Sequence, residues 1–246
     1  MLRFRTVFFD CDSTLSSIEG IDELAHAHRD QVIPLTEAAM RGEVSLESVY
    51  GRRLAIIRPS RGELERIGAL YVASLIPGAT ETIASLQRLG VEVHIISGGL
   101  RPAVLHVARV LGVPAGRVHA VDIRFDDAGD YAGYDEDSPL ARQGGKPALI
   151  QALGAVPRPS MLVGDGATDL EARSAVDTFV AFAGVEARPL VVAGADAVIH
   201  ARSLLPVLAL ALGDDASYPR EVQSLIDQGQ SLLDVPVSLS PSRTSP

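Results

Sequence analysis

The chain runs a short hydrophobic stretch, Thr6-Val7-Phe8-Phe9, directly into two acids in the sequence Asp10-Cys11-Asp12-Ser13-Thr14. Alternate residues of a β-strand share one face, so the carboxylates of Asp10 and Asp12 would lie side by side where the strand ends. Two such groups repel each other and resist burial unless a cation or a charged ligand offsets them. Packing alone does not explain this pattern, which predicts a binding site at the end of the first strand.

The composition is that of a folded, acidic protein. Its 246 residues suffice for one α/β domain, or for such a domain with a modest insertion, and 47% of them are hydrophobic. The 22 basic and 31 acidic residues give a net charge of 22 − 31 = −9. A nucleic-acid-binding surface would show clustered Lys and Arg, so we expect no nucleic-acid partner. A local site for a phosphate group stays compatible with this charge.

Three features bear on the location of the protein. Cys11 is the only cysteine, which excludes an internal disulfide and fits a reducing compartment; we expect it to be a small buried residue that faces away from the acids. Arg3 and Arg5 interrupt the apolar N-terminal run, so we expect no signal peptide. The apolar stretch 204–212 is shorter than the roughly 20 residues that span a bilayer. Together they predict a cytoplasmic protein without a membrane partner.

A long insertion is expected after the first strand. The next strand pattern, 91–96, ends at Ser97-Gly98-Gly99, and about 80 residues separate it from Phe9. A parallel crossover needs little more than one helix, and the segment 80–89, closed by Gly90, supplies it. We therefore expect residues 15–76 to form a small helical cap domain. One of its helices should start at the capping box Ser60-x-x-Glu63, with Tyr71 on its apolar face.

Strand and helix patterns alternate through the rest of the chain. They are a helix at 102–111, a hairpin of 121–125 with 130–134, a helix at 147–153, a strand at 161–163, a helix at 168–175, and strands at 178–181 and 197–199. Such alternation predicts an α/β fold whose core is a doubly wound, Rossmann-like parallel sheet. We assign this core to residues 1–14 and 77–222. Residues 223–246 are expected to form a largely disordered C-terminal tail.

Functional groups follow several of these strands. In doubly wound sheets, ligands bind at the carboxyl ends of the strands. The Ser97-Gly98-Gly99 turn precedes a helix and can offer backbone N–H groups to a phosphate. Lys146 begins another helix, and the stretch from Gly164-Asp165-Gly166 to Asp169 adds two more acids at a third strand end. Each signal is common by itself. Their joint occurrence in this order predicts one composite site.

These residues resemble the four motifs of the haloacid dehalogenase superfamily of aspartyl phosphatases. The motifs are Asp10-x-Asp12-Ser13-Thr14, Ser97-Gly98-Gly99, Lys146 and Gly164-Asp165-Gly166-x-x-Asp169. Segments 19–25, 97–102, 131–135 and 164–172 narrow the resemblance to the phosphoserine phosphatase family. The similarity extends over about residues 5–205. It implies the same fold, with a helical cap inserted after the first strand.

The resemblance also implies catalytic roles. Asp10 would be the nucleophile that forms an aspartyl-phosphate, and Asp12 would protonate the leaving oxygen and then activate water. The transferring phosphoryl group would be held by Ser97, Gly98, Gly99 and Lys146. Mg²⁺ would be bound by the side chains of Asp10 and Asp165 and by the main-chain carbonyl of Asp12, with Asp169 one layer further out or bridged by water.

Substrate selectivity is expected to lie mainly in the cap. By resemblance, Glu19 would pair with a substrate ammonium group and Arg53 with its carboxylate. Arg52 precedes Arg53, and a shift of one residue would exchange their roles. Met40 would pack near the substrate, and Thr168 would lie near it from the core.

The expected activity is therefore Mg²⁺-dependent hydrolysis of O-phospho-L-serine to L-serine and phosphate, the last step of phosphorylated serine biosynthesis. One alternative is a relative that acts on another small phosphomonoester or transfers the phosphoryl group to an alcohol such as homoserine. Another is a catalytically silent binding protein, which the presence of Asp10, Asp12, Lys146 and Asp165 disfavours. The sequence leaves the oligomeric state open, including a homodimer.

Overall fold

The computed structural model describes residues 2–40, 46–212 and 218–233. Its centre is a parallel sheet of six strands in the order β3-β2-β1-β6-β7-β8. The strands are β1 (Thr6–Phe9), β2 (Glu92–Leu100), β3 (Val118–Val121), β6 (Ser160–Gly164), β7 (Thr178–Phe182) and β8 (Ala197–Ile199). The strand order reverses at β1, and this confirms the predicted doubly wound α/β fold.

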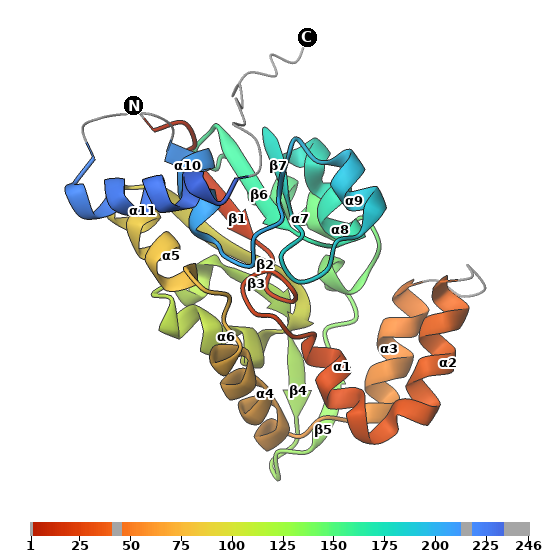
Figure 1. The fold of residues 1–246 in the computed structure, drawn as a ribbon. Helices are drawn as coiled ribbons and strands as arrows, with labels where there is room; N and C mark the ends of the chain where they lie inside the picture. The colour runs from red at the N-terminus through yellow and green to blue at the C-terminus, as the bar shows by residue number, and fades with distance from the viewer. Residues whose placement is uncertain (1, 41–45, 213–217, 234–246) are drawn as a thin grey trace.

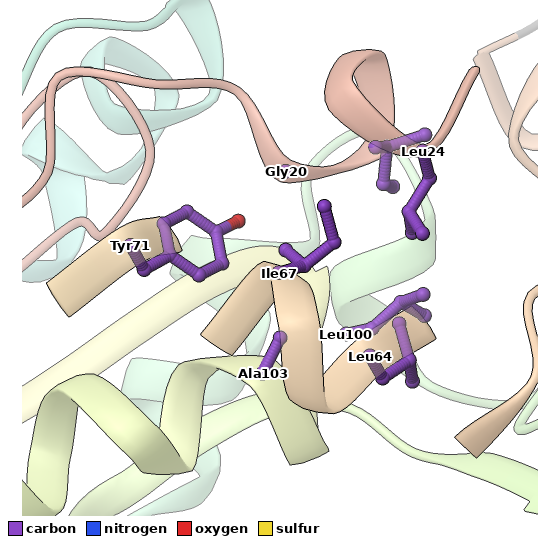
Figure 2. Close-up of a pocket in the computed structure, with 8 residues that line it drawn as sticks. Gly20, Leu24, Leu64, Ile67, Tyr71, Leu100 and Ala103 are labelled. Atoms are coloured by element: carbon purple, nitrogen blue, oxygen red, sulfur yellow. The ribbon is translucent and has the colours of Figure 1, made fainter. Parts of the chain in front are cut away.

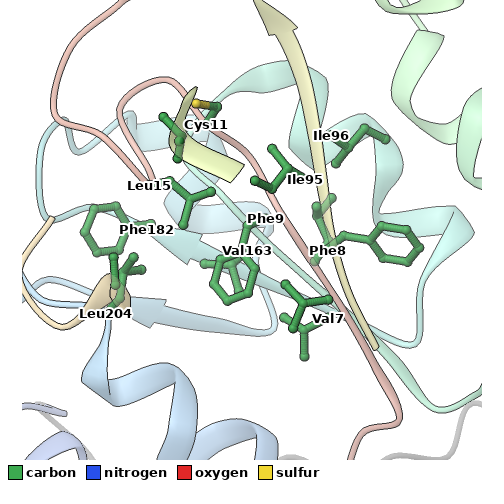
Figure 3. Packing of buried hydrophobic residues seen from close by; sticks show 14 of the residues in the cluster. Val7, Phe8, Phe9, Cys11, Leu15, Ile95, Ile96, Val163, Phe182 and Leu204 are labelled. Atoms are coloured by element: carbon green, nitrogen blue, oxygen red, sulfur yellow. The ribbon is translucent and has the colours of Figure 1, made fainter. Parts of the chain in front are cut away.

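Helices cover both faces of the sheet (Figure 1). On one side lie α5 (Ala79–Arg88), α10 (Leu205–Leu212) and α11 (Arg220–Ser231). On the other lie α7 (Gly145–Ala152), α8 (Ala167–Glu171) and α9 (Pro189–Gly194). Because both faces are covered, β1 is buried at all four positions, and Val7, Phe8 and Phe9 pack into the core shown in Figure 3.

Strand register brings the functional loops to one edge. Phe9 of β1 lies opposite Ile95 of β2 and Val163 of β6. Asp10 directly follows Phe9, while Ser97 and Asp165 each lie two residues beyond the partner strand's paired residue. Parallel strands end at the same edge of a sheet, so all three residues reach the carboxyl end of the central strands.

The segment between β1 and α5 is helical, as predicted. It contains α1 (Gly20–Leu24), η1 (Ala25–His28), α2 (Arg29–Met40), α3 (Leu46–Ile57) and α4 (Arg61–Ala73). Helices α2 and α3 project away from the sheet, whereas α4 packs against α6 (Arg101–Val110), which follows β2 (Figure 1). The division into a core and a cap at residues 15 and 76 stays a prediction. By sequence, α4 belongs to the cap, but it packs against α6 of the core.

The predicted local signals recur in the structure. The Ser60 side chain accepts the Glu63 N–H and the Glu63 carboxylate accepts the Ser60 N–H at 2.9 Å, so α4 starts with the expected capping box. Gly90 follows α5 with φ = 81°, the left-handed conformation expected at a helix end. The hairpin is formed by β4 (Ile123–Phe125) and β5 (Tyr131–Tyr134).

Two elements differ from the sequence prediction. The strand β3 is missing from the sequence prediction, whose hairpin arm 121–125 includes only its last residue, because the single residue Asp122 separates β3 from β4. The prediction of a largely disordered tail from residue 223 was wrong for its first part, since α11 continues to Ser231. Val222, Ile226 and Gly229 form a buried stripe at helical spacing that covers the apolar helix α10. Residues 234–246 lie outside the described residues.

Across the described ranges, no helix is both long enough and apolar enough to cross a lipid bilayer.

Candidate active site

A cavity of about 440 Å³ opens where β1, β2 and β6 end. Most of the residues predicted from the sequence line it. They are Asp10, Asp12, Glu19, Arg53, Gly98, Gly99, Lys146, Asp165 and Thr168. Tyr50, Asp22 and Arg188 line it as well. Met40 ends helix α2, but its side chain lies outside the described residues.

Lys146 is held between two acids at the floor of the cavity. Its Nζ lies 2.9 Å from Asp10 Oδ1 and 2.6 Å from Asp169 Oδ1, and all three side chains are buried. Burial opposes the charge on Lys146, but the negative charges of Asp10 and Asp169 outweigh it and raise the lysine pKa. Burial and the charge of Asp169 raise the pKa of Asp10 to about 7, despite the lowering effect of Lys146. The cluster thus carries more negative charge than one lysine offsets.

Three acids of this cluster form a potential cation site. Oxygen atoms of Asp10, Asp165 and Asp169 lie within 4.8 Å of one another, and all three residues are buried. An all-carboxylate donor set is typical of Mg²⁺, Ca²⁺ or Mn²⁺ sites. Burial and the charge of Asp169 raise the pKa of Asp10, and a bound cation would act against both effects. The residues present therefore fit a divalent metal ion.

Asp165 is also held by two groups that the sequence analysis did not assign. The Thr14 hydroxyl donates to Asp165 Oδ1 at 2.9 Å, and the Arg188 guanidinium pairs with Asp165 Oδ2. Arg188 further pairs with Glu186 at 2.7 Å and lies 3.7 Å from Glu19. The Arg188 guanidinium thus links Asp165 at the sheet edge to Glu19 at the start of α1.

Asp12 turns away from the metal-type cluster and is held by three donors. Its Oδ1 accepts the Tyr71 hydroxyl at 2.5 Å and the Gly20 N–H at 2.8 Å. Its Oδ2 accepts the Ser97 hydroxyl at 3.0 Å. Burial and the nearby charge of Asp10 raise the pKa of Asp12, while these three hydrogen bonds act in the opposite direction.

The last residues of β2 combine a fixed hydroxyl with backbone that lines the cavity. Ser97 is fully buried, and its Oγ accepts the Gly99 N–H at 2.9 Å, so it supports the end of the strand and does not line the cavity. Gly98 and Gly99 do line it. A Cβ at Gly99 would lie 3.0 Å from Ser97 Oγ and 3.1 Å from Asp12 Oδ2, so a side chain there would crowd the site.

The turn before Lys146 is held by Glu171, a residue 27 positions beyond Gly144 along the chain. Gly144 has φ = 71°, and its N–H donates to Glu171 at 2.9 Å. A Cβ at Gly145 would lie 1.7 Å from the carbonyl oxygen of Pro139. Both glycines therefore meet backbone requirements that let α7 start at the cavity with Lys146 in its first turn.

The helical side of the cavity carries the two predicted recognition residues. Glu19 accepts the Ser13 hydroxyl at 2.7 Å, and burial together with the charge of Asp12 raises its pKa to about 7. Arg53 lines the cavity and pairs with Asp22, whereas Arg52 is exposed outside it. The Arg53 Nε is buried without a hydrogen-bond partner among the described residues. The geometry thus favours Arg53 over Arg52 as a cavity group.

Cys11 lies between the two acids in sequence but takes no part in the cavity. Its side chain is fully buried among core residues (Figure 3). Burial and the charges of Asp12 and Asp10 raise the pKa of its thiol. Because the thiolate is the reactive form, this environment makes Cys11 unreactive near neutral pH.

The sequence analysis assigned no role to Tyr50 and Arg188, which line the cavity, or to Tyr71, which contacts Asp12 from behind the cavity lining. Tyr50 donates from its hydroxyl to the Gly98 carbonyl at 2.9 Å, and Tyr71 and Arg188 contact Asp12 and Asp165. Tyr50 and Arg188 belong to no recognised motif. Tyr71 carried a usable signal, because it is the one residue with a polar group on the apolar face predicted for the helix that starts after Ser60.

Comparison with known proteins gives a consistent assignment. The family model for haloacid dehalogenase-like hydrolases matches residues 4–177, which is most of the chain. The phosphoserine phosphatase of Homo sapiens is 42% identical over 182 residues, which are 72% of this chain and 81% of that protein.

Solved structures agree with this. A substrate-bound phosphoserine phosphatase complex matches with a TM-score of 0.70 and 25% identity, over 84% of this chain and 98% of that one. A phospho-aspartyl intermediate analogue of phosphoserine phosphatase matches with a TM-score of 0.68 and 26% identity over the same shares. The chain therefore belongs to the haloacid dehalogenase-like hydrolases and, within them, to the phosphoserine phosphatase family.

Proposed function

We propose that the protein is a phosphatase that hydrolyses O-phospho-L-serine to L-serine and phosphate, with Mg²⁺ as its cofactor and a role in serine biosynthesis. The observation that carries the proposal is the buried cluster of Asp10, Lys146, Asp165 and Asp169 at one cavity, in a chain of the phosphoserine phosphatase family. A nucleophilic carboxylate, a cation for the phosphoryl group and a metal-type acid set are the parts that phosphoryl transfer requires.

In the first step, a carboxylate oxygen of Asp10 attacks phosphorus. The phosphorus–oxygen bond to the serine side chain breaks, and its electron pair leaves with the serine oxygen. Asp12 gives its proton to that oxygen, because an alkoxide is too basic to leave unprotonated. The products of this step are L-serine and an aspartyl-phosphate on Asp10.

In the second step, Asp12 accepts a proton from a water molecule, and the water oxygen attacks phosphorus. The bond between phosphorus and the Asp10 oxygen breaks, which releases phosphate and restores the Asp10 carboxylate. Asp12 is again protonated, so both acids return to their starting forms. The position of Asp12 at the cavity, beside Asp10 but outside the metal-type cluster, supports this exchange of proton-donor and proton-acceptor roles.

Charge balance explains the other groups. A phosphate monoester brings a charge of about −2 near neutral pH, and Asp10 and Asp165 add two more. Lys146, whose pKa is raised, stays charged and holds phosphoryl oxygens together with the Gly98 and Gly99 backbone. Asp10, Asp165, the main-chain carbonyl of Asp12 and the more distant Asp169 would hold Mg²⁺, which supplies further neutralisation of the transferring group.

The ammonium and carboxylate groups of the substrate would be bound by residues on the helical side of the cavity. Glu19 suits an ammonium group, and the Nε of Arg53, which has no partner among the residues that the structure describes, suits a carboxylate. Thr168 lines the same cavity, which supports contact with the substrate from the core. The placement of Met40 beside the substrate, the cytoplasmic location and the homodimer stay predictions.

The decisive experiment is an assay of phosphate release from a panel of phosphorylated amino acids and sugars, with Mg²⁺ and with a chelator. We expect phosphoserine to be the preferred substrate, with activity lost on chelation and restored by added Mg²⁺. A second arm adds homoserine and analyses the products. Formation of phosphohomoserine, or a clear preference for another phosphomonoester, would contradict the proposal.

A further inference from the structure

The contact between Tyr71 and Asp12 joins two parts of the chain that are far apart in sequence. Tyr71 lies near the end of α4 with 1% of its surface exposed, and its hydroxyl donates to Asp12 Oδ1 at 2.5 Å. Tyr71 shares a small, mostly apolar pocket with Leu64 and Ile67 of α4, Leu100 at the end of β2 and Ala103 of α6, and α4 packs on α6 there (Figure 2). A rigid, buried helix therefore presents one hydroxyl to an acid at the cavity.

The backbone around Tyr71 is fixed as well. The Ser16 hydroxyl donates to the Tyr71 carbonyl at 3.1 Å, and the Ser17 N–H donates to the Ser74 carbonyl at 2.9 Å. A Cβ at Gly20 would lie 2.1 Å from the Tyr71 hydroxyl oxygen. The loop after β1 thus both ties down the end of α4 and leaves room for the hydroxyl by having glycine at position 20.

The two oxygens of Asp12 differ in what they accept. Oδ1 accepts both the Tyr71 hydroxyl and the Gly20 N–H. Among the described residues, only Ser97 donates to Oδ2, at 3.0 Å. A carboxylate oxygen has room for about two donors, so a proton on Oδ1 would face two other hydrogens. Oδ2 is the oxygen that can carry a proton.

We propose that Tyr71 is a positioning residue: its hydroxyl, with the Gly20 N–H, occupies Asp12 Oδ1 so that Oδ2 is the oxygen that delivers the proton to the leaving group. The inference rests on the proposed function of Asp12 as the proton donor. When the ester bond breaks, its electron pair goes to the leaving oxygen, the Oδ2 proton moves to that oxygen, and Asp12 is left as a carboxylate. Without the hydroxyl, the carboxyl group can rotate and either oxygen can hold the proton.

The test is Tyr71→Phe, which keeps the ring and removes only the hydroxyl. With enzyme in excess, the first turnover is followed on phosphoserine and on p-nitrophenyl phosphate, both with Mg²⁺. Serine must leave with a proton, whereas p-nitrophenolate is a stable anion and does not need one. We expect serine release to slow about tenfold and nitrophenol release to change by less than about twofold, with KM for phosphoserine nearly unchanged.

A matched control removes a tyrosine hydroxyl elsewhere. The Tyr218 hydroxyl donates to the Leu212 carbonyl at 2.7 Å, far along the chain from the cavity residues, and Tyr218→Phe should leave both rates at the wild-type value. With enzyme in saturating excess, the rate constant of the first turnover does not depend on the fraction of working sites, so partly unfolded protein does not distort the rates. Equal slowing on both substrates, or no slowing on either, would overturn the proposal.

Failure of the proposed function gives a different result. If the wild-type protein hydrolyses p-nitrophenyl phosphate but not phosphoserine, the proposed substrate is wrong. The comparison of Tyr71→Phe with the wild type is then made on the alkyl phosphate from the panel that the protein does hydrolyse. A selective loss on that ester would still support the role of Tyr71, and an equal loss on the alkyl and aryl esters would overturn it.

Discussion

The cavity has two walls of different character. The sheet wall carries Lys146, which is 4% exposed and whose Nζ lies 2.6 Å from Oδ1 of the fully buried Asp169. The helical wall carries Glu19, which is 43% exposed, and Arg53, which is 18% exposed and pairs with Asp22, itself 65% exposed. Groups assigned to the reaction are therefore locked by burial, and groups assigned to recognition keep partners that a ligand can displace.

This difference has a consequence for selectivity. A change in the sheet wall should affect every phosphomonoester, because the phosphoryl group is common to all of them. A change in the helical wall should affect only substrates that carry the amino-acid groups. A comparison of phosphoserine with an aryl phosphate separates the two walls, and each of the following predictions uses it.

The largest effect is expected for Asp10→Asn in the sheet wall. The amide cannot act as the nucleophile, so turnover of both substrates should fall by at least about 1,000-fold. Acid-quenched protein should also lack covalently bound phosphate, which wild-type protein should show under the same conditions. Thermal unfolding with and without Mg²⁺ provides the control for folding. Near-normal turnover of either substrate by this variant would rule out the covalent role of Asp10.

An intermediate effect is expected for Arg53→Ala in the helical wall. Loss of a partly buried charge partner typically costs about 2–5 kcal/mol, so kcat/KM for phosphoserine should fall accordingly. Hydrolysis of the aryl phosphate should change much less. Arg52→Ala is the matched control, since Arg52 is the neighbouring arginine but is exposed outside the cavity. If Arg52→Ala has the larger effect, or if Arg53→Ala weakens both substrates equally, the assignment of the helical wall is wrong.

The smallest effect is expected in how the preference for phosphoserine over the aryl phosphate depends on pH, which we attribute to Glu19. Its pKa of about 7 means that it is mostly protonated at pH 6 and mostly ionised at pH 8. Only the ionised form pairs with an ammonium group, so kcat/KM for phosphoserine relative to the aryl phosphate should rise about tenfold over this range. In Glu19→Gln this rise should disappear, while the pH dependence common to both substrates remains. A ratio with the same pH profile in both proteins would exclude Glu19 from ammonium recognition.

The sheet wall could be predicted from the sequence almost completely. Asp10, Lys146, Asp165 and Asp169 lie at strand ends or helix starts. Each local signal is common by itself, but their order along the chain is informative because parallel strands bring such positions to one edge. The position of these residues in the sequence therefore suffices to predict that they gather at one edge of the sheet.

Contacts between distant elements could not be predicted in this way. Tyr71 reaches Asp12 because α4 packs on α6, and Arg188 reaches Asp165 from the loop after β7. The spacing of residues marks Tyr71 as a polar group on an apolar helix face but does not identify Asp12 as its partner, and it gives no signal for Arg188. The strand β3 is hard to recognise because only Asp122 separates it from β4. The polar, Ser- and Pro-rich composition of the chain end obscures the helical periodicity of α11.

The burial of Cys11 makes it possible to measure whether the helical wall moves relative to the sheet wall. The only native thiol is fully buried and its pKa is raised, so maleimide reagents should leave it unmodified in the folded protein. A cysteine introduced at the exposed position of Arg52, together with one on the outer surface of the sheet domain, could then carry a pair of fluorophores without replacing a native residue near the reaction. The distance between the dyes would report directly whether α3 moves toward the sheet edge when substrate arrives.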